Sequence, residues 1–193
     1  MSPSPTDAEL AARAAAGDDR AYADLVGRHK DGLYRLLRRY AGDPEEAHEA
    51  VQEAFIAAWA ALRRYDPARP FAAWLRTIAI NKARDRARRA AVRRLVFGAG
   101  RFEDSGAMEH PAAEPPADDQ VIVRQQVAAL DRAIAALPAA LKAPLILTAL
   151  EGCSQQEAAE ILGVSAKAIE TRTYRARRLL MATLGSMEAK AGR

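Results

Sequence analysis

Residues 69–89, RPFAAWLRTIAINKARDRARR, combine aromatic side chains with a run of cations. Aromatic rings stack on unpaired bases and cations bind the neighbouring phosphates, so this composition is typical of a surface that binds single-stranded nucleic acid. A solvated helix and a membrane-surface helix are the alternatives. The membrane-surface helix is disfavoured, because its apolar face would extend along the whole segment. Leu75, Ile78 and Ala79 are expected to be core residues at helical spacing.

Residues 154–180 have the pattern of a helix-turn-helix. Ser154 and Glu157 form a capping box, Gly163 supplies the turn, and Ser165 caps the next helix. That helix would fit the major groove, where arginine recognises guanine edges and other cations bind phosphates. Two helices packed in an ordinary bundle are the alternative. The helix is expected to bury Ile169, Ala176 and Leu180 and to expose Lys167, Glu170, Thr171, Arg172, Tyr174, Arg175, Arg177 and Arg178.

Residues 43–62 are expected to form a helix with an acidic face. Asp43 is its N-cap and Pro44 occupies the first helical position. Acids near a helix N-terminus are favoured by the helix dipole, so a solvated face is the simplest interpretation. A basic protein partner is the alternative, because an acidic helix contributes nothing to binding DNA. The face carries Glu45, Glu46, Glu49, Gln52 and Glu53.

No catalytic or metal-binding constellation stands out. We find no Ser/His/Asp arrangement, no glycine-rich phosphate loop and no metal-ligand spacing. Cys153 is the only cysteine, which excludes an internal disulfide and argues against a cysteine-based zinc site. The three histidines, His29, His48 and His110, are scattered and are expected to be structural. We therefore expect a protein without enzyme activity, metal or cofactor.

Helices must position these surfaces, because the sequence predicts an all-α fold. Apolar residues recur every three or four positions, and β-branched residues are sparse. Thr6 and Glu9 form a capping box for a helix that should end near Gly17. A second helix is expected from residues 19 to 42. A loop with two prolines, residues 64–70, should precede the aromatic and cationic segment.

Two small helical domains are expected on either side of a linker. Residues 97–120 contain glycine, proline and six acids against Arg101 alone, which predicts a flexible acidic linker. The expected boundaries are a first domain at residues 1–96, the linker at 97–120, a second domain at 121–186 and a tail at 187–193. Helical periodicity resumes after the linker at Val123, Val127, Leu130, Ile134 and Leu137 and stops at Pro138.

The overall composition suits an intracellular protein with a polyanionic partner. Half of the 193 residues are apolar, and the formal net charge is +4. The sequence has neither an apolar run of about 18 residues nor a signal-peptide pattern. We therefore expect a soluble, cytoplasmic protein that does not insert into a membrane.

Three motifs, taken in order, resemble the extracytoplasmic-function (group 4) sigma factors of bacterial RNA polymerase, in the sigma-70 family. The resemblance implies a non-catalytic initiation subunit that binds core RNA polymerase, directs it to promoter DNA and is controlled by an anti-sigma factor. A stand-alone helix-turn-helix regulator is the alternative, and a nucleic-acid enzyme is the weakest one, since no acid cluster for a metal converges. The motifs are VQEAFIAAW at residues 51–59, the set Phe71, Trp74, Leu75, Ile78, Ala79 and Asn81, and the helix-turn-helix ending at Tyr174, Arg175, Ala176 and Arg177.

The resemblance also implies a role for each surface. The helix-turn-helix, through the outward residues named above, is similar to the region that recognises the −35 element as duplex, next to the polymerase β flap. The linker would thread through the polymerase toward the RNA exit path. Glu49, Gln52, Glu53 and Phe55 resemble the surface that binds the coiled coil of the β′ clamp. Capture of a flipped base of the melted −10 element would use Tyr65, Arg69, Phe71, Trp74 and Asn81, with Asn81 at the base pocket. The phosphates of the duplex just upstream would be held by Lys82, Arg84, Arg88 and Arg89.

Two departures limit what the resemblance implies. Glu170 stands where family members often carry a cation, so the −35 preference does not follow from any relative. The loop at residues 67–70 is unusually rich in proline, so the identity of the captured −10 base does not follow either.

Overall fold

The computed structural model describes residues 4–96 and 118–191, and within them it contains helices and no strand. The all-α prediction is therefore confirmed. The short turns are the 3₁₀ turn η1 (Leu62–Arg64) and the π-helical turn η2 (Ile146–Leu150). The α-helices are α1 (Asp7–Ala15), α2 (Asp19–Ala41), α3 (Pro44–Ala61), α4 (Phe71–Val96), α5 (Asp118–Ala135), α6 (Ala139–Leu145), α7 (Gln155–Leu162) and α8 (Ala166–Ala191).

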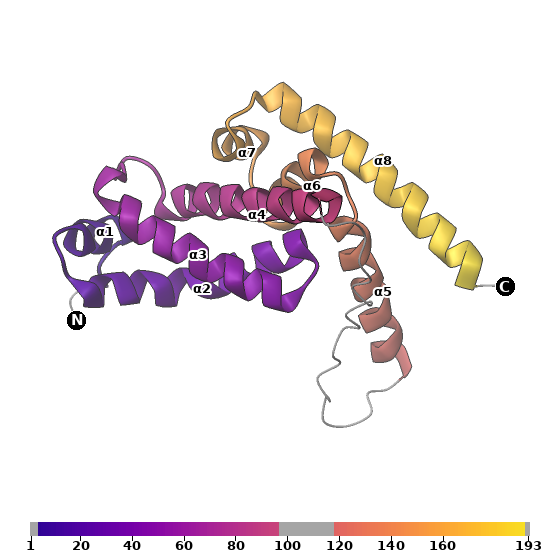
Figure 1. The fold of residues 1–193 in the computed structure, drawn as a ribbon, viewed down its shortest axis with the longest axis horizontal. Helices are drawn as coiled ribbons and strands as arrows, with labels where there is room; N and C mark the ends of the chain where they lie inside the picture. The colour runs from indigo at the N-terminus through magenta and orange to yellow at the C-terminus, as the bar shows by residue number, and fades with distance from the viewer. Residues whose placement is uncertain (1–3, 97–117, 192–193) are drawn as a thin grey trace.

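Helices α1 to α4 form the first half of the molecule (Figure 1). The capping box at Thr6 begins α1, and Asp18 and Asp43 cap α2 and α3 through their side chains. Gly42 ends α2 in the left-handed conformation, at φ 84°, which turns the chain directly into α3. The four helices pack on one core, whose fully buried side chains include Leu10, Leu25, Leu36, Leu37, Leu75 and Ile80.

Helices α5 to α8 form the second half, and α8 packs along α5, α6 and α7. Pro144 lies inside α6, where it has no N–H to donate, and the chain continues into η2. The wider turn is closed by a hydrogen bond from the Glu151 backbone N to the Ile146 carbonyl oxygen, at 3.0 Å. The core of this half contains Ile134, Ile146, Leu147 and Ile169.

The two halves are in contact with each other. Helix α4 runs between α2 and α3 on one side and α7 on the other, and α5 meets α2 (Figure 1). Residues from both halves therefore share one continuous set of buried side chains.

The element boundaries agree with most of the expectations from the sequence. The expected starts and ends of the first three helices, the proline loop and the helix-turn-helix are confirmed, but Val127 is 53% exposed and is not part of the core stripe. Most of the expected linker, and His110, lie outside the described residues, and α5 begins at Asp118, three residues earlier than the expected second domain. Among the described residues, none of the helices combines the length and the apolar character that a membrane span requires.

Candidate nucleic-acid and partner-binding surfaces

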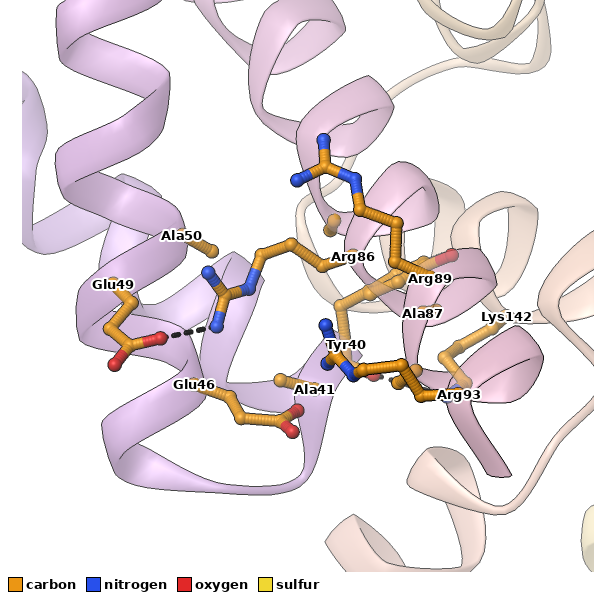
Figure 2. Close-up of a pocket in the computed structure, with 12 residues that line it drawn as sticks. Tyr40, Ala41, Glu46, Glu49, Ala50, Arg86, Ala87, Arg89, Arg93 and Lys142 are labelled. Atoms are coloured by element: carbon orange, nitrogen blue, oxygen red, sulfur yellow. Dashed lines mark hydrogen bonds and ion pairs between the residues drawn. The ribbon is translucent and has the colours of Figure 1, made fainter. Parts of the chain in front are cut away.

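The acidic face of α3 is partly neutralised from within the chain. Glu49 and Gln52 are exposed and Glu53 is half-buried. Arg86 of α4 reaches across to this face: its Nη1 lies 2.6 Å from Glu53 Oε1, and its Nη2 pairs with Glu49 (Figure 2). Two acids of this face, one exposed and one half-buried, thus already contact a cation. Sequence reasoning missed Arg86, which it grouped with the other arginines of α4.

Phe55 exposes little of its ring, so its assignment to the polymerase-binding surface stays a prediction. The residue is 8% exposed and belongs to the core, because it lies on the face of α3 that packs against α2. Its carbonyl oxygen accepts a hydrogen bond from the Tyr22 hydroxyl at 2.5 Å. Burial raises the pKa of Tyr22 to about 12.

An apolar patch, which the sequence pattern did not predict, adjoins the acidic face. Ile56 is 70% exposed and Trp59 is 41% exposed. Trp59 packs edge-on against Tyr22, with ring centroids 4.6 Å apart. Together with Asp19 and Phe55, these side chains line an open hollow of about 360 Å³. Exposed apolar side chains next to charged ones are typical of a protein-binding surface.

Tyr65, Phe71 and Trp74 form an aromatic cluster where the proline loop enters α4. Their ring centroids lie 5.1 to 5.5 Å apart. Phe71 is only 2% exposed and also contacts the ring of His29, so it supports the cluster from inside and offers almost no surface for stacking on a base. Its part in a −10 surface stays a prediction. Tyr65 and Trp74 are half-buried at the surface. Their exposed edges are available to a ligand.

The proline loop is fixed by its own hydrogen bonds. The Tyr65 hydroxyl donates to the Arg69 carbonyl oxygen at 2.6 Å, and the Asp66 carboxylate accepts from the Ala68 N–H at 2.9 Å. Burial raises the pKa of Tyr65, so the hydroxyl remains a donor at neutral pH. The side chain of Arg69 is left exposed beside the cluster.

Helix α4 brings Trp74 and Asn81 onto one face. The two residues are seven positions apart, which is two helical turns, or about 10 Å along the axis. Asn81 is exposed, as are Arg88 and Arg89, whereas Lys82 and Arg84 are half-buried. Arg88 pairs with Asp85 at 3.3 Å, and both side chains are well exposed. Arg88 can therefore exchange Asp85 for another anion at little cost.

The helix-turn-helix has the geometry expected for it. Gly163 adopts the left-handed conformation at φ 64°, and the Ser165 hydroxyl accepts a hydrogen bond from the Ala168 N–H at 3.2 Å. Ile169 and Ala176 are fully buried against α6 and α7, so α8 presents a defined outer face. On that face Tyr174 is 63% exposed, Arg175, Arg177 and Arg178 are exposed, and Thr171 and Arg172 are half-buried.

Helix α8 also contains an ion pair, a buried threonine and two exposed apolar residues. Lys167 Nζ lies 2.8 Å from Glu170 Oε2, and both side chains are exposed, so Glu170 offsets one cation at the start of the helix. Thr173 is buried, and its hydroxyl lies 3.5 Å from the hydroxyl of Thr148. Farther along, Leu179 and Met181 are exposed, which the helical pattern did not predict.

The described residues hold no cluster of His, Cys, Asp and Glu that would bind a metal ion. His29 pairs with Asp7 at 2.7 Å, and His48 stacks on Tyr34 with ring centroids 4.4 Å apart. Cys153 is half-buried, and burial raises the pKa of its thiol, which makes it a weak nucleophile. These side chains serve packing and local pairing.

Comparison with known proteins gives matches to both halves. The family model "Sigma-70 region 2" matches residues 25–93, and "Sigma-70, region 4" matches residues 128–180. The RNA polymerase sigma factor CnrH of Cupriavidus metallidurans is 40% identical over 98% of this chain and 100% of its own length. The ECF RNA polymerase sigma factor SigM of Mycobacterium tuberculosis is 32% identical over 93% of this chain and 85% of its own.

Two solved structures are also similar to this chain. CnrH in complex with the cytosolic domain of CnrY has a TM-score of 0.67 at 35% identity, and covers 93% of this chain and 97% of the solved one. The sigma factor RpoE of Bartonella quintana, in complex with the anti-sigma factor NepR, has a TM-score of 0.67 at 25% identity. The match covers 85% of this chain and 96% of the solved one.

Proposed function

Because the chain belongs to the extracytoplasmic-function sigma factors of the sigma-70 family, we propose that it binds core RNA polymerase and directs it to promoters of one sequence class. It does so in the cytoplasm and catalyses no reaction itself. The observation that carries this proposal is the presence, in order, of a region 2 bundle with an exposed acidic and apolar face and a region 4 helix-turn-helix with an exposed basic face.

The polymerase-binding surface is the exposed part of α3. Glu49, Gln52 and Glu53 offer negative charge and a hydrogen-bonding amide to the basic coiled coil of the β′ clamp, and Ile56 and Trp59 extend the contact with apolar area. Complementary charge speeds association and selects the partner, whereas burial of the aromatic side chain contributes affinity. The second half lies next to the β flap in the assembled enzyme.

Promoter recognition is divided between the halves. The outer face of α8 binds the −35 element as duplex, with Arg175, Arg177 and Arg178 within reach of bases and phosphates. In the first half, Asn81 and the exposed edges of Tyr65 and Trp74 receive an unstacked base of the −10 element, and Arg88 and Arg89 hold nearby phosphates. Capture of such a base offsets the few kcal/mol that unpairing costs.

Control by an anti-sigma factor is part of the proposal. CnrH and RpoE were each solved with a partner, the cytosolic domain of CnrY and the anti-sigma factor NepR. The exposed apolar and charged side chains of α3 and α8 would be the surfaces that such an inhibitor covers, because polymerase and DNA need the same ones.

Transcription in vitro tests the proposal. The purified chain is added to core RNA polymerase of the organism that encodes it, and transcripts from genomic DNA are mapped. We expect transcripts that begin at defined sites and are absent with core enzyme alone. An Arg175→Ala/Arg177→Ala variant should lose them, and an Arg35→Ala variant, changed at an exposed arginine of α2 that belongs to neither surface, should retain them.

A stand-alone regulator would behave differently in this experiment. It would bind its operator tightly without polymerase and would start no transcripts of its own. Absence of defined transcripts, combined with tight duplex binding by the chain alone, would overturn the proposal.

A further inference from the structure

Arg86 of α4 bridges two carboxylates of α3. Its Nη1 lies 2.6 Å from Glu53 Oε1, and its Nη2 pairs with Glu49 Oε2, a contact drawn in Figure 2. Glu49 and Glu53 are four positions apart, which places them on neighbouring turns of one helix face. A planar guanidinium has N–H groups that point in fixed directions, so it can meet two separate carboxylates at once.

The packing of α4 on α3 explains why Arg86 reaches these acids. Ala50 of α3 and Ala83 of α4 are both buried, and small side chains at a helix contact let the two backbones approach closely. Arg86 follows Ala83 by three positions, so it lies on the same face of α4, at the edge of the core. Its side chain is 26% exposed. The tertiary fold therefore delivers one partly shielded cation to the acidic face.

The bridge holds the two acids in place. Carboxylates one helical turn apart repel each other, and a free glutamate side chain samples many rotamers. A cation between Glu49 and Glu53 opposes the repulsion and restricts both side chains. Burial lowers the pKa of Arg86, but its hydrogen bonds to the two glutamates outweigh this effect and raise the pKa above its usual value. Arg86 thus remains charged and paired.

The bridged acids keep one side free. Glu49 Oε1 and Glu53 Oε2 have no hydrogen-bond partner among the residues that the structure describes. The Glu49 side chain is 62% exposed and that of Glu53 is 35% exposed, and each carboxylate oxygen can accept a hydrogen bond. Arg86 offsets only one of the three charges of Glu46, Glu49 and Glu53, so this part of α3 stays negative. It can therefore accept a further cation from outside.

We propose that Arg86 is a positioning residue of the polymerase-binding surface, which holds the Glu49 and Glu53 carboxylates in the orientation that receives a basic side chain of core RNA polymerase. The proposal rests on the function proposed above. The advantage is preorganisation: side-chain freedom that binding would otherwise remove is already lost in the free chain. Arg86 acts through the two acids and needs no contact with polymerase itself.

A role in charge alone would have the opposite effect. Removal of Arg86 makes the face more negative, which strengthens its attraction for a basic partner. If Arg86 only masked the acids, its loss would therefore tighten the association with core polymerase. If Arg86 positions them, its loss weakens the association in spite of the more favourable charge. The sign of the change separates the two roles.

A binding assay with purified core polymerase and labelled chain measures that sign. Arg86→Ala should weaken association by about fivefold. Arg86→Lys should recover most of it and stay within about twofold of wild type, because an ammonium keeps the charge but lacks the planar fork. Arg35→Ala, the same loss of charge at an exposed position of α2, should bind as wild type does. Equal or tighter binding by Arg86→Ala overturns the proposal.

A double-mutant cycle separates positioning from a general effect on the fold. In a chain that carries Glu49→Gln and Glu53→Gln, no carboxylate is left to position, so adding Arg86→Ala should change the affinity by less than about 1.5-fold. A loss as large as in the wild-type background would show that Arg86 acts through the fold, and would overturn the proposal. Urea unfolding of each variant shows whether it is folded. Arg86→Lys takes the place of Arg86→Ala in the cycle if the alanine variant is unfolded.

NMR of the free chain separates this inference from the proposed function. A bridged guanidinium rotates slowly, so Arg86 should give separate Nη–H signals that merge when Glu49 and Glu53 are both changed to Gln. Merged signals in wild type would show that the bridge is absent in solution, and would overturn the inference alone. Separate signals in a chain that does not bind core polymerase would refute the proposed function, and the positioning role with it. Separate signals, binding by wild type and weaker binding by Arg86→Ala support both.

Discussion

Helices α4 and α8 have the same length, 26 residues, and both combine aromatic, apolar and arginine residues, yet they use them differently. Helix α8 makes its main contacts with helices of its own half, and its buried residues Ile169, Thr173, Ala176 and Leu180 form a single stripe. Helix α4 contacts α2 and α3 of its own half and also α7 of the other. A helix packed on one side keeps the outer face that its periodicity predicts, whereas a helix packed on two sides does not.

The comparison is tested most strongly by removing one aromatic ring from each half. Phe71→Ala should lower the free energy of unfolding by about 3 to 5 kcal/mol, because it leaves a cavity in the core. Tyr174→Ala should change it by less than about 0.5 kcal/mol, because that ring is exposed, but should weaken duplex binding. Urea unfolding measures both. A Phe71→Ala variant of normal stability that fails to bind the −10 single strand would return Phe71 to the base pocket.

The acidic face beside α4 gives the next largest expected effect. Glu53→Arg should weaken association with core polymerase at least tenfold, or by about 1.4 kcal/mol, because it places a cation beside Arg86 and opposite a basic partner. A competition assay with labelled wild-type chain measures this loss. Asp31→Arg is the matched control for charge. Equal affinity of the two variants would remove Glu53 from the polymerase surface.

One arginine of the outer face of α8 has an expected effect whose size depends on what its side chain contacts. Arg175→Ala should reduce affinity for the −35 duplex, by about 1 to 3 kcal/mol if the side chain contacts a base. If it contacts a phosphate, the slope of log K against log salt should become shallower by about 0.9. A titration at several salt concentrations distinguishes the two contacts. Unchanged affinity and slope would show that this position faces away from the DNA.

The smallest expected effect is the fall in the free energy of unfolding at high pH, caused by Tyr22 in the first half. The pKa of Tyr22 is raised to about 12 in the folded chain, so the unfolded chain loses this proton first, near pH 10. The stabilisation is thus complete below pH 10 and is lost as the pH rises toward 12. Because the side chain is only half-buried, the loss should be on the order of 1 kcal/mol. Urea unfolding at pH 9 to 12 should show a steeper decline for wild type than for Tyr22→Phe; parallel curves would contradict it.

The structure confirms the sequence-based predictions for features that only neighbouring residues determine. The capping boxes at Thr6 and Ser154 and the glycines at 42 and 163 act within one helical turn, so the helix ends and the helix-turn-helix were predicted correctly. The outer face of α8 also followed, because three apolar positions at helical spacing determine which side of a helix is buried.

The sequence is less informative about residues whose environment depends on a distant element. Phe55 and Phe71 were placed on expected binding surfaces because of the motifs that contain them, but tertiary contacts leave them only 8% and 2% exposed. Arg86 is one of many cations in its segment, and nothing local indicates that it pairs with Glu49 and Glu53, since that depends on how α3 and α4 are placed together. Charge pairing across helices is a tertiary property, and periodicity does not report it.

The π-helical turn η2 has a consequence for how this family member can change over time. A π turn holds one residue more than an α turn, and Glu151 is the first residue after it. Deletion of a single codon within residues 146–150 would return the segment to α-helical spacing and rotate Glu151 by about 100° around the helix axis. The carboxylate, which pairs with Arg39 at 3.3 Å and with Arg76 at 3.6 Å, would then point away from both arginines while the helix-turn-helix beyond it stayed intact. One codon is thus enough, in a lineage, to break these contacts between the two halves without altering any residue on the outer face of α8.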